Sequence, residues 1–348
     1  MDVLSLVCPV CKGSLQPHPH GYACPRDEIT FSRTLGILDF RVPLARGKPE
    51  PVDTRVTRLL AEYDGHTFAE LLDYHAALFS SGIPANLVRW YILHACSSAA
   101  RAEYALAEIR RSTPLSIGSR FLELGCGTGG FLVAAARQFK GVIGLDIEVA
   151  RLILARKQLE EAGEEATLIC ADAQYLPFPE NLFHLVVAID LLEHVAGQKD
   201  LICEAHRVLA PSGRLFLATP NRWSLAPESH VKVWGLGFLP RAWRDPVARF
   251  VRNLPYESIN TLNYFDLRRL IAQSGFGRCE ILLPAFHPEH IRRLSAWERM
   301  VIPFYHALKE LPLVKGLIYL FGPLFHVICV KPTIDGIRST PTRRVRAG

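Results

Sequence analysis

The sequence has few of the features that mark membrane-spanning, disordered or repetitive proteins. Only 21% of its 348 residues are charged and 49% are apolar, a balance that excludes wholesale disorder. The apolar run from Gly316 to Val330 has 15 residues and contains Pro323, so it is too short and too broken to span a bilayer. No internal repeat or low-complexity tract stands out. The composition therefore predicts a folded chain of one large domain or two modest ones.

Excess positive charge is absent from most of the chain. The net charge is +6, from 40 Lys+Arg and 34 Asp+Glu. The segment from Trp223 to Asn260 contributes +2, residues 336–348 contribute +4, and the remainder is neutral. The terminal charges are Arg338, Arg343, Arg344 and Arg346. This distribution excludes a uniformly cationic nucleic-acid binder and favours an acidic or membrane-associated partner near these two segments.

The nine cysteines are too dilute for a secreted disulfide scaffold. No charged start followed by an apolar run opens the sequence, so we expect a cytoplasmic protein with reduced thiols. Peripheral contact with the inner face of a membrane is an open alternative. Six cysteines stand in apolar or helical surroundings and are expected to pack as free thiols: Cys96, Cys126, Cys170, Cys203, Cys279 and Cys329.

Changes in sequence texture divide the chain into four parts. Residues 1–42 form a small module punctuated by Pro, Gly and Cys, and residues 43–115 a linker and a helical segment. Residues 116–332 form the main domain, with insertions at 223–260 and 285–323, and residues 333–348 a basic tail. Within the main domain, short apolar runs alternate with amphipathic stretches. This alternation predicts an open, doubly wound α/β domain with a parallel sheet covered on both faces.

A glycine-rich segment lies at the junction of a predicted strand and the next helix, where residues 121–130 read FLELGCGTGG. In doubly wound sheets ligands bind at the carboxyl ends of strands, and glycines let a ligand approach the backbone. Glu123 precedes the loop, and Asp146 ends the next strand, 19 residues beyond Gly127. Because a carboxylate there can accept both hydroxyls of a ribose, the pattern favours a nucleotide-type ligand. A sharp turn without a ligand is the alternative.

Four segments, in order across roughly residues 118–332, resemble the class I S-adenosylmethionine-dependent methyltransferases. They are the glycine loop, the end of the second strand, the Asp172-Ala173 pair, and the stretch formed by LPFP (176–179), FHLVV (183–187) and LEHV (192–195). The resemblance implies a Rossmann-like, doubly wound, mostly parallel seven-stranded sheet. With the small N-terminal module and the helical linker, this completes the expected fold.

The same resemblance implies a role for each residue around the S-adenosyl-L-methionine cofactor. The glycine loop would pack against the methionine part, Asp146 would hold the ribose beside Ile147 at the adenine, and Asp172 would contact the adenine amino group. The residues expected to bind the cofactor are Glu123, Gly125, Gly127, Gly129, Asp146, Ile147, Asp172 and Ala173.

Asp190, Glu193 and His194 follow the fourth strand, where the resemblance places the transferred methyl group. We expect these to be the catalytic residues, with His194 as a general base, because the pKa of histidine lies near neutral pH. The alternative is that Glu193 and His194 only cap and orient the end of the strand. The spacing also resembles the ubiquinone-pathway O-methyltransferases, and this implies Mg²⁺ on the two carboxylates and the histidine. His230 and Arg222 are candidates for the substrate side, or solvated residues.

The N-terminal module is similar to a zinc ribbon in which the last ligand has changed. Cys8 and Cys11 are followed, after twelve residues, by Cys24 and then Asp27 in place of the usual fourth cysteine. We expect a structural Zn²⁺ on Cys8, Cys11, Cys24 and Asp27, with Glu28 and His20 as other candidates for the fourth ligand. The alternative is a metal-free ribbon held by its apolar end.

The predicted activity is methyl transfer to a small-molecule or lipid-like acceptor, with oxygen as the expected acceptor atom. The Asn-Pro-Pro-Tyr type of signature associated with amino-group methylation is absent. The second insertion is apolar; a helix packed on the sheet is the favoured interpretation, and a lid or a helix that meets a membrane are the alternatives. An RNA methyltransferase is the alternative enzyme, but residues 1–42 carry no net charge to hold RNA. A non-catalytic cofactor-binding module is the third hypothesis.

Overall fold

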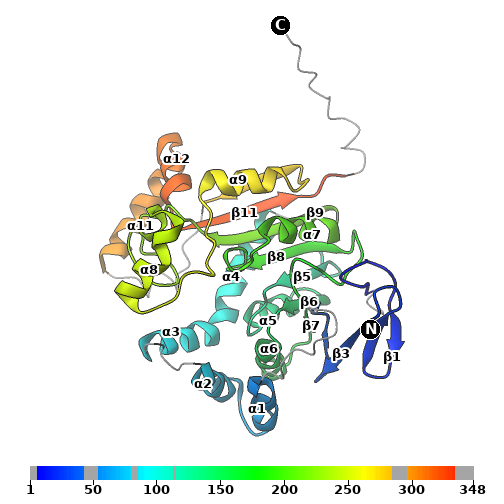
Figure 1. Ribbon diagram of the computed structural model, residues 1–348. Helices are drawn as coiled ribbons and strands as arrows, with labels where there is room; N and C mark the ends of the chain where they lie inside the picture. Colours follow the sequence, from blue (N-terminus) through cyan, green and yellow to red (C-terminus); the bar gives the residue numbers. More distant parts are fainter. Residues whose placement is uncertain are drawn as a thin grey trace.

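The computed structural model describes residues 6–42, 54–79, 83, 85–112, 115–283 and 296–333. One eleven-stranded sheet runs through the molecule in the order β1-β2-β3-β4-β7-β6-β5-β8-β9-β11-β10 (Figure 1). The strands are β1 Gln16–His18, β2 Gly21–Cys24, β3 Ile29–Thr34, β4 Ile37–Asp39, β5 Arg120–Leu124, β6 Gly141–Asp146, β7 Thr167–Cys170, β8 Phe183–Ile189, β9 Leu209–Pro220, β10 Arg278–Leu282 and β11 Leu324–Val330.

The seven strands from β7 to β10 form the expected doubly wound sheet. β7, β6, β5, β8 and β9 are parallel, whereas β11 is antiparallel to β9 and β10 is antiparallel to β11. Successive side chains of β8 enter opposite cores: Leu185 and Val187 pack on one face, Val186 and Ala188 on the other. Continuous apolar strands are expected where both faces of a parallel sheet are covered, and the fold prediction is confirmed.

Helices cover both faces of this sheet. One face carries α1 Thr54–Glu62, α2 Phe68–Phe79, α4 Ser98–Ser112, α5 Gly130–Ala136 and α6 Val149–Ala162. The other carries α7 Gln198–Val208 and α9 Tyr264–Ala272. The remaining helices are α3 Ala85–Cys96, α8 Arg241–Arg252, α11 Ala296–Leu308 and α12 Pro312–Phe321, with short 3₁₀ turns η1 Leu192–His194 and η2 Leu236–Phe238. None of the helices in the described ranges is long and apolar enough to cross a membrane.

The helical segment before the main domain packs against it. Leu59, Leu71 and Leu106 are fully buried and share a core with Leu152 of α6. α4 lies so close to α5 that a Cβ on Gly130 would collide with the Ser98 side chain. This segment therefore forms part of the wall around the glycine loop, and apolar burial holds it there.

The N-terminal module adds its strands to the edge of the central sheet. β4 pairs in parallel with β7, with Leu38 opposite Ile169, and the backbone amide of Phe40 donates to the carbonyl of Cys170 at 2.7 Å. Phe40 is fully buried beside Phe31 in the core that contains α7. The apolar end of the module is thus continuous with the main sheet.

The second insertion forms two helices at one end of the sheet. In α11, Ile302 is buried, whereas α12 contains no buried residue. α12 contacts the sheet through Tyr319, whose hydroxyl donates to the carbonyl of Ile281 at 3.0 Å and whose ring stacks on Tyr264. The helices therefore touch the sheet at its margin and leave several apolar side chains exposed, among them Met300, Phe304, Leu313 and Leu317. The basic tail residues Arg338, Arg343, Arg344 and Arg346 lie outside the described residues.

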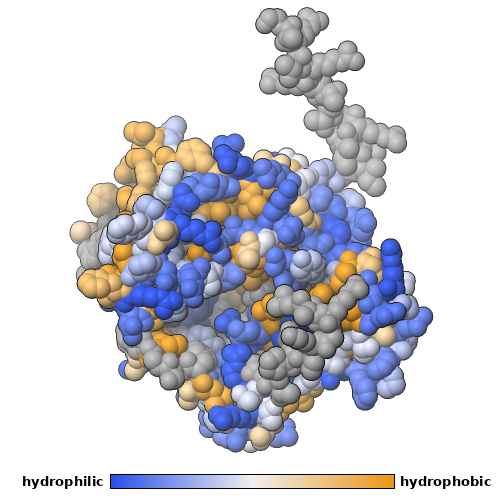
Figure 2. Space-filling model, viewed as in Figure 1, coloured by the Kyte–Doolittle hydropathy of each residue, from blue (hydrophilic) through white to orange (hydrophobic). Residues whose placement is uncertain are grey.

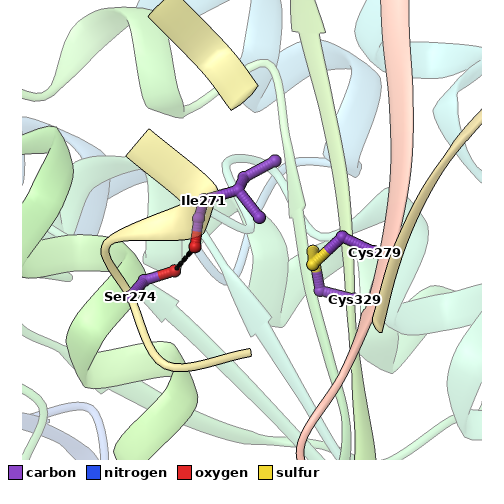
Figure 3. The surroundings of a disulfide bond; sticks show 4 residues. All are labelled: Ile271, Ser274, Cys279 and Cys329. Atoms are coloured by element: carbon purple, nitrogen blue, oxygen red, sulfur yellow. Dashed lines mark hydrogen bonds between the residues drawn. A yellow bond between two sulfur atoms is a disulfide. The ribbon is translucent and has the colours of Figure 1, made fainter. Parts of the chain in front are cut away.

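Cys279 and Cys329 form a disulfide between β10 and β11, which corrects the expectation that both are free thiols (Figure 3). They are direct partners in the antiparallel register, and their Cα atoms lie 4.1 Å apart. Cys329 is buried and Cys279 is exposed at the edge strand. Register across two strands, rather than any local pattern, brings the two cysteines together.

Candidate functional site

The glycine loop between β5 and α5 is a tight turn held against β6. The amides of Gly125 and Cys126 both donate to the carbonyl of Leu145, at 2.7 and 2.9 Å. Gly129 has a φ of 87°, and a Cβ there would lie 2.8 Å from the Cβ of Ala155. Gly127 has a φ of 52° and open space where a side chain would project. The loop therefore presents bare backbone to a ligand at this point.

Asp146 lies at the end of β6 and faces the loop. Its Oδ2 accepts from the amide of Gly127 and its Oδ1 from the amide of Glu148, each at 2.9 Å. Burial raises the pKa of Asp146, and the two amides and Arg151 oppose that effect. Each carboxylate oxygen keeps a free acceptor site, so the side chain is oriented to receive two hydroxyl donors.

Glu123 is the buried acid beneath the loop. Only 5% of the residue is exposed, and Oε2 has no hydrogen-bond partner among the described residues. Burial, followed by the charge of Asp146, raises the pKa of Glu123 well above its ordinary value. A buried acceptor without a partner is costly, and a donor from a bound ligand would satisfy it.

The end of β7 supplies the third part of this site. The Asp172 carboxylate is fixed by Gln174, whose backbone amide donates at 2.9 Å and whose side-chain amide donates at 3.0 Å. Ala173 is buried, whereas Ile147 is 52% exposed beside Asp146. An exposed isoleucine next to a buried acid suits the face of a planar ring. All the residues predicted to bind the cofactor therefore lie along the carboxyl ends of β5, β6 and β7.

The helical segment contributes residues that the sequence analysis did not identify. Tyr91 of α3 packs partly buried at this site. Burial raises the pKa of Tyr91; the charge of Arg151 opposes this rise and that of Asp146 adds to it. Arg101 of α4 lies close enough to Asp190 to lower its pKa in part. No local pattern marks either residue, because tertiary packing alone places them here.

Asp190 follows β8 with a φ of 50°, in the left-handed region that non-glycine residues rarely adopt. Its amide donates to the carbonyl of Ala218 at 3.0 Å, and a Cβ on Gly125 would lie 2.9 Å from the next side chain, Leu191. The side chain is open to solvent, yet desolvation by the surrounding protein raises the pKa of Asp190. The turn that carries Asp190 and Leu191 therefore lies against the glycine loop.

Glu193, His194 and His230 form a compact cluster whose donor atoms lie within 4.8 Å of one another. Glu193 is fully buried; Oε2 accepts from the hydroxyl of Thr219 at 2.9 Å, and Oε1 lies 3.8 Å from Nε2 of His230. The rings of His194 and His230 meet edge to face, with centroids 5.1 Å apart. Asp190 is not a member of this group, so the expected set of Asp190, Glu193 and His194 is not the one that the structure assembles.

Burial and the neighbouring His230 lower the pKa of His194 to about 4, so our expectation of a near-neutral pKa is wrong. Burial raises the pKa of Glu193 to about 7, and Asp190 adds to that rise. Burial also lowers the pKa of His230, but the hydrogen bond and charge of Glu228 outweigh it and raise the pKa overall. His230 is therefore the stronger base of the two histidines.

Glu228 fixes His230 in place. Its Oε1 lies 2.7 Å from Nδ1 of His230, and its Oε2 accepts from the amides of His230 and Val231 at 2.7 and 2.8 Å. This contact directs Nε2 of the imidazole toward Glu193. The sequence analysis named His230 only as a candidate on the substrate side, and the two-residue spacing from Glu228 was too weak a signal to reveal the pair.

A cavity of about 380 Å³ lies beside this cluster. Its walls come from the first insertion and the start of β11, and Glu228 belongs both to the wall and to the His230 contact. Arg222 and Lys232 line it, as do Tyr256 and Thr261, whose hydroxyls are buried. The cavity can therefore hold a polar molecule next to the end of β9.

The N-terminal module forms a second cluster of possible ligands. The donor atoms of Cys8, Cys11, Cys24 and Asp27 all lie within 4.8 Å of one another. Asp27 Oδ2 accepts from the thiols of Cys8 and Cys24, at 3.1 and 3.3 Å. Three thiols and a carboxylate form a donor set that suits tetrahedral Zn²⁺. Among the described residues, Asp27 completes the cluster, whereas Glu28 and His20 are not part of it.

Comparison with known proteins gives a match over the central part of the chain. Residues 122–217 match the family described as "Methyltransferase domain". The 27-O-demethylrifamycin SV methyltransferase of Amycolatopsis mediterranei is 34% identical over 129 residues, which cover 33% of this chain and 45% of that protein. The ubiquinone biosynthesis O-methyltransferase of Pseudomonas aeruginosa is 34% identical over 142 residues, 39% of this chain and 59% of that protein.

Among solved structures, Haemonchus contortus phosphoethanolamine N-methyltransferase 2 in complex with S-adenosyl-L-methionine aligns with a TM-score of 0.45 and 21% identity. The alignment covers 66% of this chain and 52% of that chain. The two curated relatives above are matched over about half of their length, at 45% and 59%.

Proposed function

Because the chain contains a class I S-adenosylmethionine-dependent methyltransferase domain, we propose that the protein transfers a methyl group from S-adenosyl-L-methionine to a small-molecule or lipid-like acceptor, at oxygen. The proposal rests on carboxylate oxygens around the glycine loop that can still accept hydrogen bonds from a ligand. Glu123 keeps one buried carboxylate oxygen without a partner, and Asp146 is oriented with free acceptor sites beside Gly127.

The residues at this edge fit the cofactor. Asp146 would accept the ribose hydroxyls, Glu123 would receive a donor from the methionine part, and Ile147 would cover the adenine, whose amino group Asp172 would accept. The cofactor supplies an activated methyl group on a sulfonium. The protein therefore mainly has to hold a nucleophile in line and remove its proton.

The residues beyond β8 are placed for those two tasks. Glu228 holds His230 at 2.7 Å, and Nε2 of His230 faces the Glu193 carboxylate, so this cluster is placed to promote loss of the acceptor's proton. Asp190 follows β8, and the ring of His194 meets that of His230 edge to face. Two relatives support oxygen as the acceptor atom, since their names describe an O-methyltransferase and a methyltransferase of a 27-O-demethyl compound.

The cavity beside Glu228 is the proposed acceptor site. Its cationic side chains Arg222 and Lys232 and its buried hydroxyls on Tyr256 and Thr261 suit an acceptor that carries an acidic or strongly polar group. Its volume of about 380 Å³ suits a small molecule or the head of a lipid, not a folded macromolecule.

Exposed apolar side chains support a membrane as the source of the acceptor. Figure 2 shows apolar residues gathered over α12 and α11 at the upper left. Met300, Phe304 and Leu313 are 66%, 64% and 78% exposed. α8 adds Trp243 and Phe250, 65% and 92% exposed, on a helix with four arginines and one aspartate. Aromatic and basic residues on one amphipathic helix are typical of segments that lie on an anionic bilayer.

A flotation assay tests this surface. The protein should float with vesicles that contain about 30% anionic lipid and should stay at the bottom of the gradient with neutral vesicles. Each basic charge near an anionic surface contributes about 1 kcal/mol to membrane binding. The double variant Trp243→Ser with Phe250→Ser should reduce flotation. The control Leu35→Ser, which changes an exposed apolar residue of the N-terminal module, should not. Equal flotation by all three proteins would remove the membrane from the proposal.

A zinc ion is the proposed occupant of the N-terminal cluster. The three thiols and Asp27 leave no open ligand position, so the ion would be structural and would tie β2 to the preceding loop. Elemental analysis should find zinc in the purified protein, and Cys8→Ser should lose it.

One experiment tests the activity and separates it from RNA methylation. A cell extract incubated with the protein and methyl-labelled cofactor should yield label in an organic-solvent extract. Label in RNA would replace the acceptor class with nucleic acid. Binding of S-adenosylhomocysteine without any labelled product in complete extracts would favour a non-catalytic binding module.

A further inference from the structure

The cluster at the end of β8 combines the side chains of two separate segments. Glu193 and His194 come from the turn η1, and His230 comes from the first insertion, 36 positions later in the chain than His194. Their donor atoms lie within 4.8 Å of one another. We propose that Glu193, His194 and His230 bind a divalent transition-metal ion, with two imidazoles and one carboxylate as ligands.

The first independent observation is the state of Glu193. The residue is fully buried, and Oε1 has no hydrogen-bond partner in the described part of the chain although it points toward His230 at 3.8 Å. A buried carboxylate oxygen without a partner is costly, and fully buried carboxylates in proteins are usually paired or coordinate metals. A cation between Oε1 and the two imidazoles would satisfy it.

The second observation is the set of contacts behind the ligands. Nδ1 of His230 meets the Glu228 carboxylate at 2.7 Å, and this leaves Nε2 as the coordinating atom. The hydroxyl of Thr219 holds Glu193 Oε2 at 2.9 Å, and this leaves Oε1. Histidine ligands commonly donate their second nitrogen to a carboxylate, and ligating carboxylates are themselves hydrogen-bonded.

The ligand types select the class of metal. Mg²⁺ prefers oxygen ligands in octahedral geometry, whereas imidazole suits zinc, iron, cobalt and other transition metals. Asp190, the second carboxylate that a magnesium site would need, lies outside the cluster of donor atoms. The composition of this cluster therefore favours a transition metal over the magnesium expected from sequence.

The role of the metal rests on the proposed methyl transfer. Three protein ligands leave coordination positions open, and Glu228, which holds His230, also lines the cavity. An acceptor hydroxyl bound there would lose its proton to solvent more readily. Its oxygen would then form the bond to the methyl carbon while the carbon–sulfur bond breaks and its electron pair stays on sulfur.

Metal content of the full-length protein tests the site without reference to activity. The protein is stripped by dialysis against chelator and titrated with Co²⁺, and bound metal is counted by elemental analysis and visible absorption. The wild type should bind one equivalent that His230→Ala loses. Glu228→Gln should bind the metal about 10- to 100-fold more weakly, as is typical when a group that hydrogen-bonds a metal ligand is removed.

A separate variant distinguishes metal bound at the N-terminal cluster from metal bound at His230. Cys8→Ser should lose a different equivalent, recognised by thiolate-to-cobalt absorption, and should keep the equivalent that depends on His230. His66→Ala, which changes a partly exposed histidine between α1 and α2, is the matched control and should bind as the wild type does. Binding of S-adenosylhomocysteine by His230→Ala shows that the variant is folded.

Unchanged cobalt stoichiometry and affinity in both His230→Ala and Glu228→Gln would overturn the metal site. If those variants lose metal but the wild type binds no S-adenosylhomocysteine, the proposed function fails and the metal site stands. If the wild type methylates an acceptor but takes up no Co²⁺ equivalent that depends on His230, the metal site fails and the function stands.

Discussion

The ammonium group of Lys12 lies 2.7 Å from Oε2 of Glu204 and joins the N-terminal module to α7. The same Glu204 oxygen accepts from the amide of Leu176 at 2.8 Å, and its other oxygen accepts from Arg207 at 2.6 Å. Lys12 also donates to the carbonyl of Leu176 at 3.2 Å. One partly buried carboxylate therefore connects the module, the helix and the loop after β7.

Glu204→Gln should destabilise the protein by about 1–3 kcal/mol, because the amide leaves two cations with weaker partners in a site that is only partly open to water. Urea unfolding followed by circular dichroism measures the change. Glu103→Gln is the control: Glu103 pairs with Arg137 at 2.7 Å, but both side chains are about half exposed, at 48% and 47%. Its effect should stay within about 0.5 kcal/mol. Equal effects of the two variants would contradict this account of the docking contact.

The contribution of Glu204 should also depend on pH. Burial raises its pKa, but the hydrogen bonds of Arg207 and Lys12 outweigh burial, so the pKa in the folded protein is lowered. A lowered folded pKa gives stability that is fully present above the unfolded value of about 4.3 and is lost as pH falls through the folded value. The stability difference between wild type and Glu204→Gln should be constant from pH 7 to about 5 and should shrink below about pH 4. A difference that grows on acidification would contradict the sign.

The disulfide between Cys279 and Cys329 should stabilise the edge of the sheet. It closes a loop with a sequence separation of 50 residues, for which a cross-link typically contributes about 2–4 kcal/mol. Reductant should therefore lower the thermal unfolding temperature of the wild type but not of Cys279→Ser with Cys329→Ser. Alkylation and mass spectrometry of the unfolded, unreduced protein should find seven free thiols among the nine cysteines. Nine alkylated thiols would mean that the bond is absent in solution.

The sequence predicted the features that depend on local pattern. The alternation of apolar runs gave the doubly wound sheet, and the spacing from Gly127 to Asp146 placed both at adjoining strand ends, where the structure joins them by a 2.9 Å hydrogen bond. What it could not predict depends on contacts between distant segments. The pairing of Leu38 with Ile169 and the meeting of His230 with Glu193 are of this kind. No periodicity along the chain encodes such a contact.

The carboxylate of Asp146, at the end of β6, should be required for cofactor binding. Asp146→Ala removes the carboxylate that the amides of Gly127 and Glu148 orient, and with it the acceptor for the ribose. Hydrogen bonds to a charged group contribute about 1.5–3 kcal/mol, so calorimetry should show S-adenosylhomocysteine binding weakened roughly 10- to 150-fold. Glu164→Ala changes an acid just after the C-terminal end of α6 that pairs with Arg137 at 3.5 Å, and this variant should bind as the wild type does. Because Asp146 is buried, the thermal unfolding of the variant without ligand must be compared as well. Retained affinity in a folded Asp146→Ala protein would show that the ribose is held elsewhere, and absence of binding by the wild type would remove the cofactor from this site.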